Sequence, residues 1–174
     1  MLLPPMTDYH EHIKTYRRPA LPETFNFAEV IDGYAQDSDR MALIWTNSEG
    51  EERRFTYKQI SEESQRIANT LKAQGVTRGD RVIVMLPRIP EWQMTMLAIF
   101  RLGAVAIPCI TMLQQKYLEY RINLVTPKAV VTVRGETEKF SGLLGDDVAR
   151  FSVGYGDGTP AEGWQDFAAE VAQA

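Results

Sequence analysis

The sequence predicts an α/β fold in which a mostly parallel sheet lies between two layers of helices, with an N-terminal arm and a small hairpin in addition. Apolar strand-like segments alternate with helix-like segments between residues 80 and 133, and the links between them are short. The strand-like run 82–86 is apolar throughout, which is typical of a strand covered on both faces. This alternation implies right-handed crossovers and parallel strands with helices on both faces.

The composition is that of one globular domain. The chain has 174 residues, 44% of them hydrophobic and 24% charged, which is enough to bury a core. No apolar run is long enough to span a membrane, and the first ten residues lack the pattern of a signal peptide. The net charge of -4 argues against nucleic acid as a partner. The single cysteine, Cys109, fits a reducing compartment, so we expect a cytoplasmic protein.

The N-terminal part of the chain divides into an arm and the start of the body. Residues 1–25 contain prolines at positions 4, 5, 19 and 22 and both histidines without a sustained period, and are interpreted as an arm. The body, residues 26–174, begins at Asn26, a good helix N-cap that is followed by apolar residues at helical spacing up to Tyr34. Residues 41–45 and 52–57 then predict a hairpin, because residues 47–50 have the composition of a turn.

The middle of the chain gives the clearest helix and strand signals. Thr56 and Gln59 have the spacing of a capping box, which starts a helix. Gly75 suits the left-handed position that ends this helix. The strand 82–86 follows, and Pro90 suits the first turn of a helix that Gly103 ends. That helix is apolar almost all round, so it should be deeply packed.

Two further strands and a helix complete the predicted sheet. Residues 104–108 form a short strand, residues 114–125 a helix and residues 129–133 a third strand. Beyond position 134 the pattern weakens. Residues 151–153 are interpreted as one more strand, and residues 164–171 as a final helix after a loop.

Local chemistry identifies no complete active site. No glycine is followed by lysine, so a Walker-type phosphate loop is absent, and no serine lies in a Gly-X-Ser-X-Gly elbow. The glycine-rich residues 154–158 are interpreted as a surface turn. Cys109 has no histidine near it in the sequence and is interpreted as a buried small hydrophobe. His10 and His12 do not share a helix face, so no metal site is predicted.

The remaining polar and aromatic groups are interpreted as structural. Adjacent carboxylates, at 62–63 and 146–147, lack the spacing of a cooperating acid and base and are expected in solvent. Tyr117 and Tyr120, three residues apart, are expected to pack on a neighbouring element.

Four segments, in their order and spacing, resemble the early core motifs of the adenylate-forming enzymes, the AMP-dependent synthetase and ligase superfamily. They are FTY at 55–57, RGDRV at 78–82, LPRIPEW at 86–92 and RLGAVAIP at 101–108. Each segment alone is common, but the set is specific. The resemblance covers residues 26–133 and extends more weakly to the end of the chain. Within the superfamily these segments are similar to acyl-CoA synthetases, and the third is similar to medium-chain members.

The resemblance implies a ligase of fatty acid metabolism that works in two steps. ATP and a carboxylic acid would give an acyl-adenylate and pyrophosphate, and the thiol of coenzyme A would then displace AMP. Magnesium and cationic side chains would neutralise the phosphates. ATP, magnesium and coenzyme A are therefore expected for the whole enzyme.

The family's phosphate loop, adenine-binding motif, hinge and catalytic lysine have no counterpart in these 174 residues. The one Pro-Lys pair, Pro127-Lys128, has no glycine in the preceding residues 123–126 and matches a helix-to-strand turn instead. Residues 26–174 are accordingly expected to be part of the N-terminal subdomain of a longer enzyme, inactive alone, without catalytic residues and binding none of the cofactors by itself.

One ligand contact follows from the resemblance. Ile110, Thr111 and Met112 come directly after the second parallel strand, where related enzymes approach coenzyme A, and are candidates for lining its channel.

The sequence also leads to expectations about the partners of this chain and to two alternative functions. The partners implied are the remainder of the enzyme and its carboxylic acid substrate. Self-association is also expected, because the apolar helix 90–102 needs cover on every side. Two other functions remain open: a stand-alone module that binds a nucleotide or an acyl group, and a structural or interaction domain.

Overall fold

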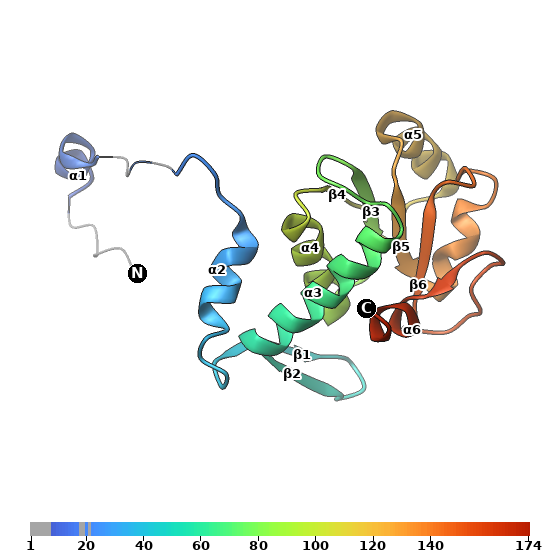
Figure 1. Ribbon diagram of the computed structural model, residues 1–174, viewed down its shortest axis with the longest axis horizontal. Helices are drawn as coiled ribbons and strands as arrows, with labels where there is room; N and C mark the ends of the chain where they lie inside the picture. Colours follow the sequence, from blue (N-terminus) through green and yellow to red (C-terminus); the bar gives the residue numbers. More distant parts are fainter. Residues whose placement is uncertain (1–7, 18–19, 21) are drawn as a thin grey trace.

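A five-stranded sheet, in which every neighbouring pair of strands is parallel, forms the centre of the protein (Figure 1). The computed structural model describes residues 8–17, 20 and 22–174. The strand order is β4-β3-β5-β6-β7. The strands are β3 (Arg81–Met85), β4 (Val105–Pro108), β5 (Ala129–Val133), β6 (Ala149–Val153) and β7 (Gln165–Asp166). The predicted α/β fold class is thus confirmed.

Helices cover both faces of this sheet. They are α2 (Phe27–Tyr34), α3 (Tyr57–Ala73), α4 (Pro90–Arg101), α5 (Gln115–Val125), the 3-10 helix η1 (Arg134–Phe140) and α6 (Phe167–Ala172). A further helix, α1 (Tyr9–Thr15), buries none of its residues and belongs to neither core cluster. One core cluster joins α2, α3, α4 and α6 to one face, and the other joins α5 and η1 to the opposite face. The sheet is therefore the middle of three layers, as predicted.

The packing of β3 explains why its sequence is apolar from Val82 onward. Val82 and Val84 belong to one core cluster, whereas Ile83 and Met85 belong to the other, and all four are completely buried. Successive side chains of a strand point to opposite faces, so a strand between two helix layers needs an apolar residue at every position.

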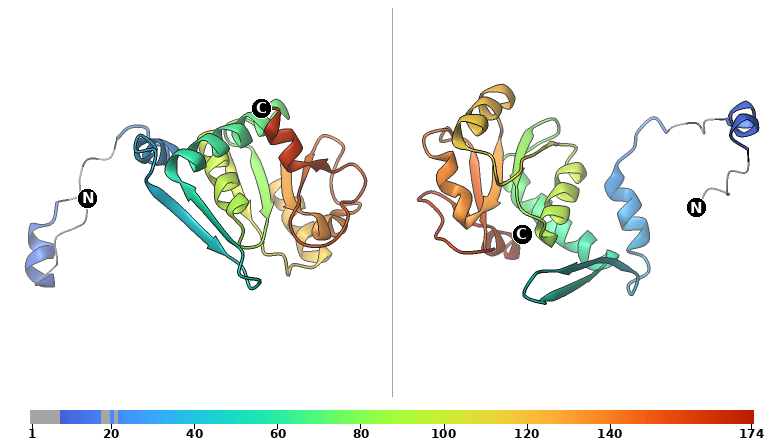
Figure 2. Two further views of the ribbon diagram at one scale, coloured as in Figure 1. Left: turned by 90° about the horizontal axis from the view of Figure 1, so that it is seen from below. Right: turned by 180° about the vertical axis from the view of Figure 1, so that it is seen from behind.

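A two-stranded antiparallel hairpin, β1 (Met41–Thr46) and β2 (Glu52–Thr56), forms a separate sheet beside the central one (Figure 2). Its turn is fixed by the side-chain oxygen of Asn47, which accepts hydrogen bonds from the backbone of Glu49 and Glu51. Gly50 has a φ of +80°, a conformation that favours glycine. The predicted hairpin is confirmed and is placed at the carboxyl end of β3.

The predicted ends of α3 are also confirmed. Thr56 accepts from the backbone N–H of Gln59 at 3.3 Å, and the Gln59 side chain accepts from the Thr56 N–H at 2.8 Å, so the capping box is complete. After the last turn, Gly75 adopts a φ of +83°.

The N-terminal arm contains a helix that the sequence analysis missed. Asp8 accepts hydrogen bonds from the backbone of His10 and Glu11 and thereby starts α1. Helix α1 has seven residues and buries none of them, so it lacks the apolar period by which helices are identified. The prolines at positions 4, 5 and 19 lie outside the described residues. The division into residues 1–25 and 26–174 stays a prediction.

The C-terminal third also differs from the prediction. Residues 134–140 form η1, and a two-residue strand, β7, precedes the final helix. Helix α6 begins only at Phe167, because Asp166 caps it by accepting from the N–H of Ala169 at 3.0 Å. A strand of two residues carries no alternation, and a 3-10 helix does not follow the 3.6-residue period, so neither element gives a sequence signal.

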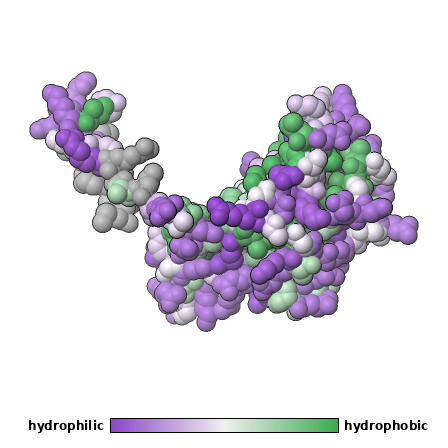
Figure 3. Space-filling model, turned by 45° about the horizontal axis from the view of Figure 1, so that its top comes forward, coloured by the Kyte–Doolittle hydropathy of each residue, from purple (hydrophilic) through white to green (hydrophobic). Residues whose placement is uncertain are grey.

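Helix α4 is packed as predicted, but its cover comes from this chain. Residues Met94, Leu97, Ala98 and Ile99 are buried, and α2 and α3 pack against the helix. Exposed apolar side chains remain at several places, among them Phe100 of α4, which is 38% exposed. On α5, Tyr117, Tyr120 and Leu124 are 49%, 67% and 68% exposed. Apolar surface is visible on the upper right lobe in Figure 3, the side on which α5 lies in Figure 1. The prediction that Tyr117 and Tyr120 pack on a neighbouring element is wrong.

Candidate functional site

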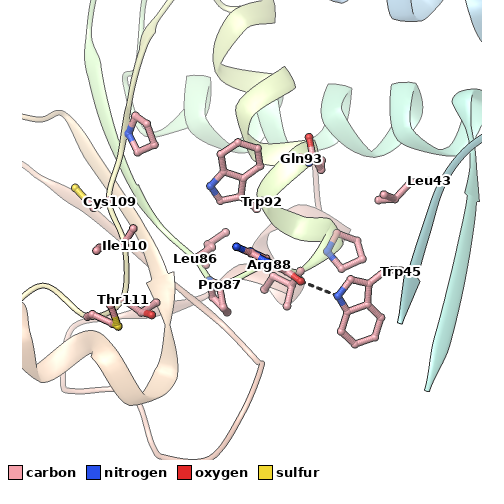
Figure 4. A pocket seen from close by; sticks show the side chains of 14 residues that line it. Leu43, Trp45, Leu86, Pro87, Arg88, Trp92, Gln93, Cys109, Ile110 and Thr111 are labelled. Atoms are coloured by element: carbon pink, nitrogen blue, oxygen red, sulfur yellow. Dashed lines mark hydrogen bonds between the residues drawn. The ribbon is translucent and has the colours of Figure 1, made fainter. Parts of the chain in front are cut away.

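A cavity of about 950 Å³ opens at the carboxyl ends of β3 and β4, beside the hairpin. Figure 4 shows hairpin residues on one side, the segment after β4 on the other and the segment after β3 between them. The lining is mainly apolar: Leu43, Trp45, Leu86, Pro87, Arg88, Ile89, Pro90, Trp92, Gln93, Pro108, Cys109, Ile110, Thr111 and Met112. Arg88 is the one charged residue among them. A cavity of this size and lining suits a small molecule with an apolar part.

The floor of the cavity is the connection from β3 to α4. The backbone N–H of Ile89 bonds to the carbonyl of Pro87 at 2.8 Å, which turns the chain sharply after the strand. Pro90 then occupies the first position of α4, where its missing N–H leaves no helical bond unmade. This turn directs Trp92 and Gln93, in the first turn of α4, to the cavity.

Trp45 joins the hairpin wall to the floor. Its indole Nε1 donates a 2.7 Å hydrogen bond to the backbone carbonyl of Arg88, drawn as a dashed line in Figure 4. The Trp45 ring also meets the ring of Tyr155 edge-on, at a centroid distance of 6.3 Å. Arg53 of β2 bonds to Glu91 of α4 at 2.8 Å and adds a second tie between hairpin and helix. The hairpin is thus held against the cavity by specific contacts.

The opposite wall is the loop after β4, which contains the three residues predicted as ligand contacts. Cys109 continues the pairing of β4 with β3 through a 2.9 Å bond from its N–H to the carbonyl of Val84. Ile110 and Met112 are 61% and 82% exposed, and Thr111 is half-buried. The structure therefore brings Ile110, Thr111 and Met112 together on one wall of the cavity. Whether they contact coenzyme A stays a prediction.

Cys109 lies at the base of this wall. It is 6% exposed and packs in the core cluster on the α5 side of the sheet, as expected of a buried small hydrophobe. Burial raises the pKa of the Cys109 thiol. A thiol that stays protonated at neutral pH is a poor nucleophile, so Cys109 is a lining residue.

The other candidates named from the sequence do not line the cavity, although Tyr155 contacts the lining residue Trp45. His10 and His12 are exposed on α1, and residues 154–158 form an exposed turn. Within the described ranges, no three His, Cys, Asp or Glu side chains are grouped so that they could hold a metal ion. The described residues therefore do not fit a site for magnesium or for the phosphates of ATP, and no chemical step is assigned to them.

Sequence reasoning missed Trp45 and Arg88 as neighbours. They lie 43 positions apart, and no local pattern connects a hairpin residue to a loop beyond the following helix and strand. One signal was present in the sequence. Leu43 and Trp45 lie two positions apart in β1, and this spacing predicts that both side chains point to the same, partly covered face.

The comparisons with known proteins agree on the family. Residues 32–172 match the family described as AMP-binding enzyme. The chain is 37% identical over 138 residues to "Acyl-coenzyme A synthetase ACSM5, mitochondrial" of Rattus norvegicus, covering 75% of this chain and 24% of that protein. It is 35% identical over 131 residues to "Acyl-coenzyme A synthetase ACSM3, mitochondrial" of Homo sapiens, covering 71% of this chain and 22% of that protein.

A solved structure, that of an acyl-CoA synthetase from Brucella canis, aligns with a TM-score of 0.83 and 28% sequence identity. The alignment covers 97% of this chain and 32% of that one. The chain spans about a quarter of the length of the curated relatives it matches.

Those relatives are named as mitochondrial proteins, whereas the composition predicted the cytoplasm, so the location of this chain stays a prediction. Across the described residues, the helices are too short or too polar to cross a membrane.

Proposed function

The chain belongs to the AMP-binding enzyme family, and we propose that it forms the N-terminal part of an AMP-forming acyl-CoA synthetase. The whole enzyme would activate a carboxylic acid with ATP, release pyrophosphate and transfer the acyl group from acyl-AMP to coenzyme A. The identity to acyl-CoA synthetases over most of this chain supports the proposal.

The observation that carries the proposal is the mainly apolar cavity at the carboxyl ends of β3 and β4. In open parallel sheets, ligands bind outside the carboxyl ends of the strands. The loop containing Ile110, Thr111 and Met112 would form one wall of the path taken by the pantetheine arm of coenzyme A. This arm is long and narrow, with few charges, so apolar side chains with a few backbone polar groups suit it.

In this proposal the residues of the cavity bind and exclude water, and they take no part in bond making. The apolar side chains, Trp92 and Ile110 among them, would keep water from a thioester-forming site nearby. Cys109 would stay protonated and would not compete with the thiol of coenzyme A. The groups that hold ATP and magnesium would come from the remainder of the enzyme, since this chain aligns with only 24% of the length of its relative.

We also propose that the 174 residues have no activity by themselves. Activation of a carboxylate requires cations around the phosphates, and only Arg88 among the cavity residues is charged.

One observation favours a second candidate, a stand-alone binding module. The cavity of about 950 Å³ within this chain is large enough for a small molecule, so a ligand could bind without the remainder of an enzyme. A third candidate, an interaction domain, is favoured by the exposed apolar side chains of α5.

The test is thioester formation by the polypeptide that the full reading frame of this chain encodes. The purified product is incubated with ATP, magnesium, coenzyme A and a series of carboxylic acids, and acyl-CoA is measured. We expect acyl-CoA that depends on all four components. A product that makes no acyl-CoA with any acid, while the 174-residue chain binds a nucleotide or an acyl group saturably in calorimetry, would favour the module instead.

A further inference from the structure

Lys139, in the 3-10 helix η1, reaches the loop after β4. Its Nζ donates a 2.6 Å hydrogen bond to the backbone carbonyl of Thr111, 28 positions earlier in the chain. Thr111 is the central residue of the wall formed by Ile110, Thr111 and Met112. The contact therefore ties the segment that follows β5 to the cavity wall that follows β4.

The charge of Lys139 is paired as well as hydrogen-bonded. Its ammonium group forms an ion pair with Glu136, one turn earlier in η1. The Lys139 and Glu136 side chains are 33% and 23% exposed, so the pair is shielded from water more than a surface pair is. A hydrogen bond from an ammonium group in such a place is stronger than one between neutral groups. Glu136 orients the ammonium group that holds Thr111.

Besides the bond from Lys139, the loop is held by the half-buried side chain of Leu113, which packs against the core cluster on the α5 side, and by one backbone hydrogen bond. Within it, the N–H of Leu113 bonds to the carbonyl of Ile110 at 3.2 Å. The side chains of Ile110 and Met112 are mostly exposed and contribute little packing. A second tie comes from the same side, because the side chain of Gln115 donates a 2.8 Å bond to the carbonyl of Ser141, just after η1.

From these contacts we propose that Lys139 is a positioning residue. It holds the carbonyl of Thr111 and so keeps the loop 110–113 in the conformation that forms the cavity wall. That this conformation serves coenzyme A rests on the function proposed above. The conformation of the loop itself does not rest on the proposed function, because it is set by contacts within this chain.

Cys109 offers a direct readout of the loop. It is the single cysteine of the chain, it lies next to Ile110, and it is 6% exposed. Cys109 is nearly buried although it lines the cavity, so a thiol reagent needs a local opening to reach it, and freeing the adjacent loop should raise the rate of labelling.

The experiment measures the rate at which N-ethylmaleimide labels the folded 174-residue chain at pH 8. The variants are Lys139→Met, which loses the ammonium group, and Lys139→Arg, which keeps a cationic donor. Lys128→Met is the matched control. Lys128 is 34% exposed, donates to the carbonyl of Asp147 at 3.3 Å and pairs with its carboxylate, but it lies away from the cavity.

We expect Lys139→Met to label about tenfold faster than the unchanged chain, which corresponds to the loss of one charge-assisted hydrogen bond. Lys139→Arg and Lys128→Met should label at nearly the unchanged rate. An unchanged rate in a folded Lys139→Met chain would overturn the proposal, and so would an equal rise in Lys128→Met, since that would indicate general loosening.

A second variant keeps the proposal testable if Lys139→Met does not fold. Glu136→Gln retains Lys139 but removes the partner that orients it, so labelling should rise by a smaller factor, about threefold. No rise in this variant would contradict the role of Lys139. Because no substrate is present in either measurement, a negative result leaves the proposed acyl-CoA synthetase function standing.

Discussion

Arg101 donates hydrogen bonds from both terminal nitrogens to the two carboxylate oxygens of Asp32, each at 2.7 Å. The pair joins the end of α4 to α2. Ser61 and Ser64 of α3 extend it, since Ser61 donates to Asp32 at 2.6 Å and Arg101 donates to Ser64 at 3.1 Å. One polar network therefore connects three of the four helices on this face of the sheet, α2, α3 and α4.

The first prediction concerns this network. Asp32→Asn removes the charge and one of the two parallel bonds, so it should lower the free energy of unfolding by about 1–2 kcal/mol. Urea unfolding at pH 7 checks the value. Asp39→Asn, a change of an exposed aspartate, is the control and should alter stability by less than about 0.5 kcal/mol. A stable Asp32→Asn chain would show that the pair does not hold α2.

A pH dependence follows from the same carboxyl group. The hydrogen bonds from Arg101 lower the pKa of Asp32 in the folded protein, against the opposing effect of burial. Its stabilising contribution is complete above the unfolded pKa, about 3.9, and is lost as the pH falls through the lower folded value. Below pH 4 the free energy of unfolding should fall more steeply with decreasing pH in the unchanged chain than in Asp32→Asn. Identical slopes between pH 3 and 5 would contradict this.

The capping box predicts a third outcome. Thr56→Ala leaves the N–H of Gln59 without its side-chain partner and should cost about 1 kcal/mol of unfolding free energy. Thr24→Ala, at an exposed position outside the helices, serves as the control and should have little effect. Equal stabilities of the two variants, measured by thermal unfolding, would mean that α3 starts independently of its cap.

The fourth prediction separates the two half-reactions of the proposed enzyme. In the intact enzyme, Met112→Lys should raise the KM for coenzyme A about tenfold. It should leave ATP–pyrophosphate exchange unchanged, because the loop would border the path of coenzyme A alone. The Met112 side chain is 82% exposed, so the change should not disturb folding. Met41→Lys, at an exposed methionine of the hairpin, is the control. A loss of exchange equal to the loss of thioester formation would contradict the assigned role.

Self-association is the fifth prediction. Tyr117, Tyr120 and Leu124 form an exposed apolar stripe on α5, and such a surface favours association. Sedimentation should show that the 174-residue chain forms dimers or larger species as concentration rises. Leu124→Lys should shift it to the monomer, whereas Asn69→Lys, on the exposed side of α3, should not. A monomer at every concentration would argue against this surface.

The sequence predicted those elements whose signals are local. The capping box of Thr56 and Gln59 and the apolar run of β3 each require only neighbouring residues, so both could be recognised. Helix α4 was recognised too, but its apolar surface did not show that α2 and α3 would cover it. That cover includes the Asp32–Arg101 contact, which joins residues 69 positions apart.

The candidate site was only half predictable for the same reason. Ile110, Thr111 and Met112 could be placed at the end of a strand, and family resemblance gave them a possible ligand. Trp45 and Lys139 are joined to the cavity walls through hydrogen bonds to backbone carbonyls, which any residue provides. Such contacts leave no pattern in the sequence of either partner, so only the folded chain identifies them.

The central claim is that this chain is the N-terminal part of an acyl-CoA synthetase whose phosphate-binding groups lie in the remainder of the enzyme. ATP–pyrophosphate exchange tests it most directly, measured on the 174-residue chain and on the polypeptide encoded by its full reading frame. We predict no exchange above a heat-killed control for the chain, and exchange that requires a carboxylic acid for the longer polypeptide. Exchange by the 174 residues alone, or a reading frame that ends at codon 174, would contradict the claim.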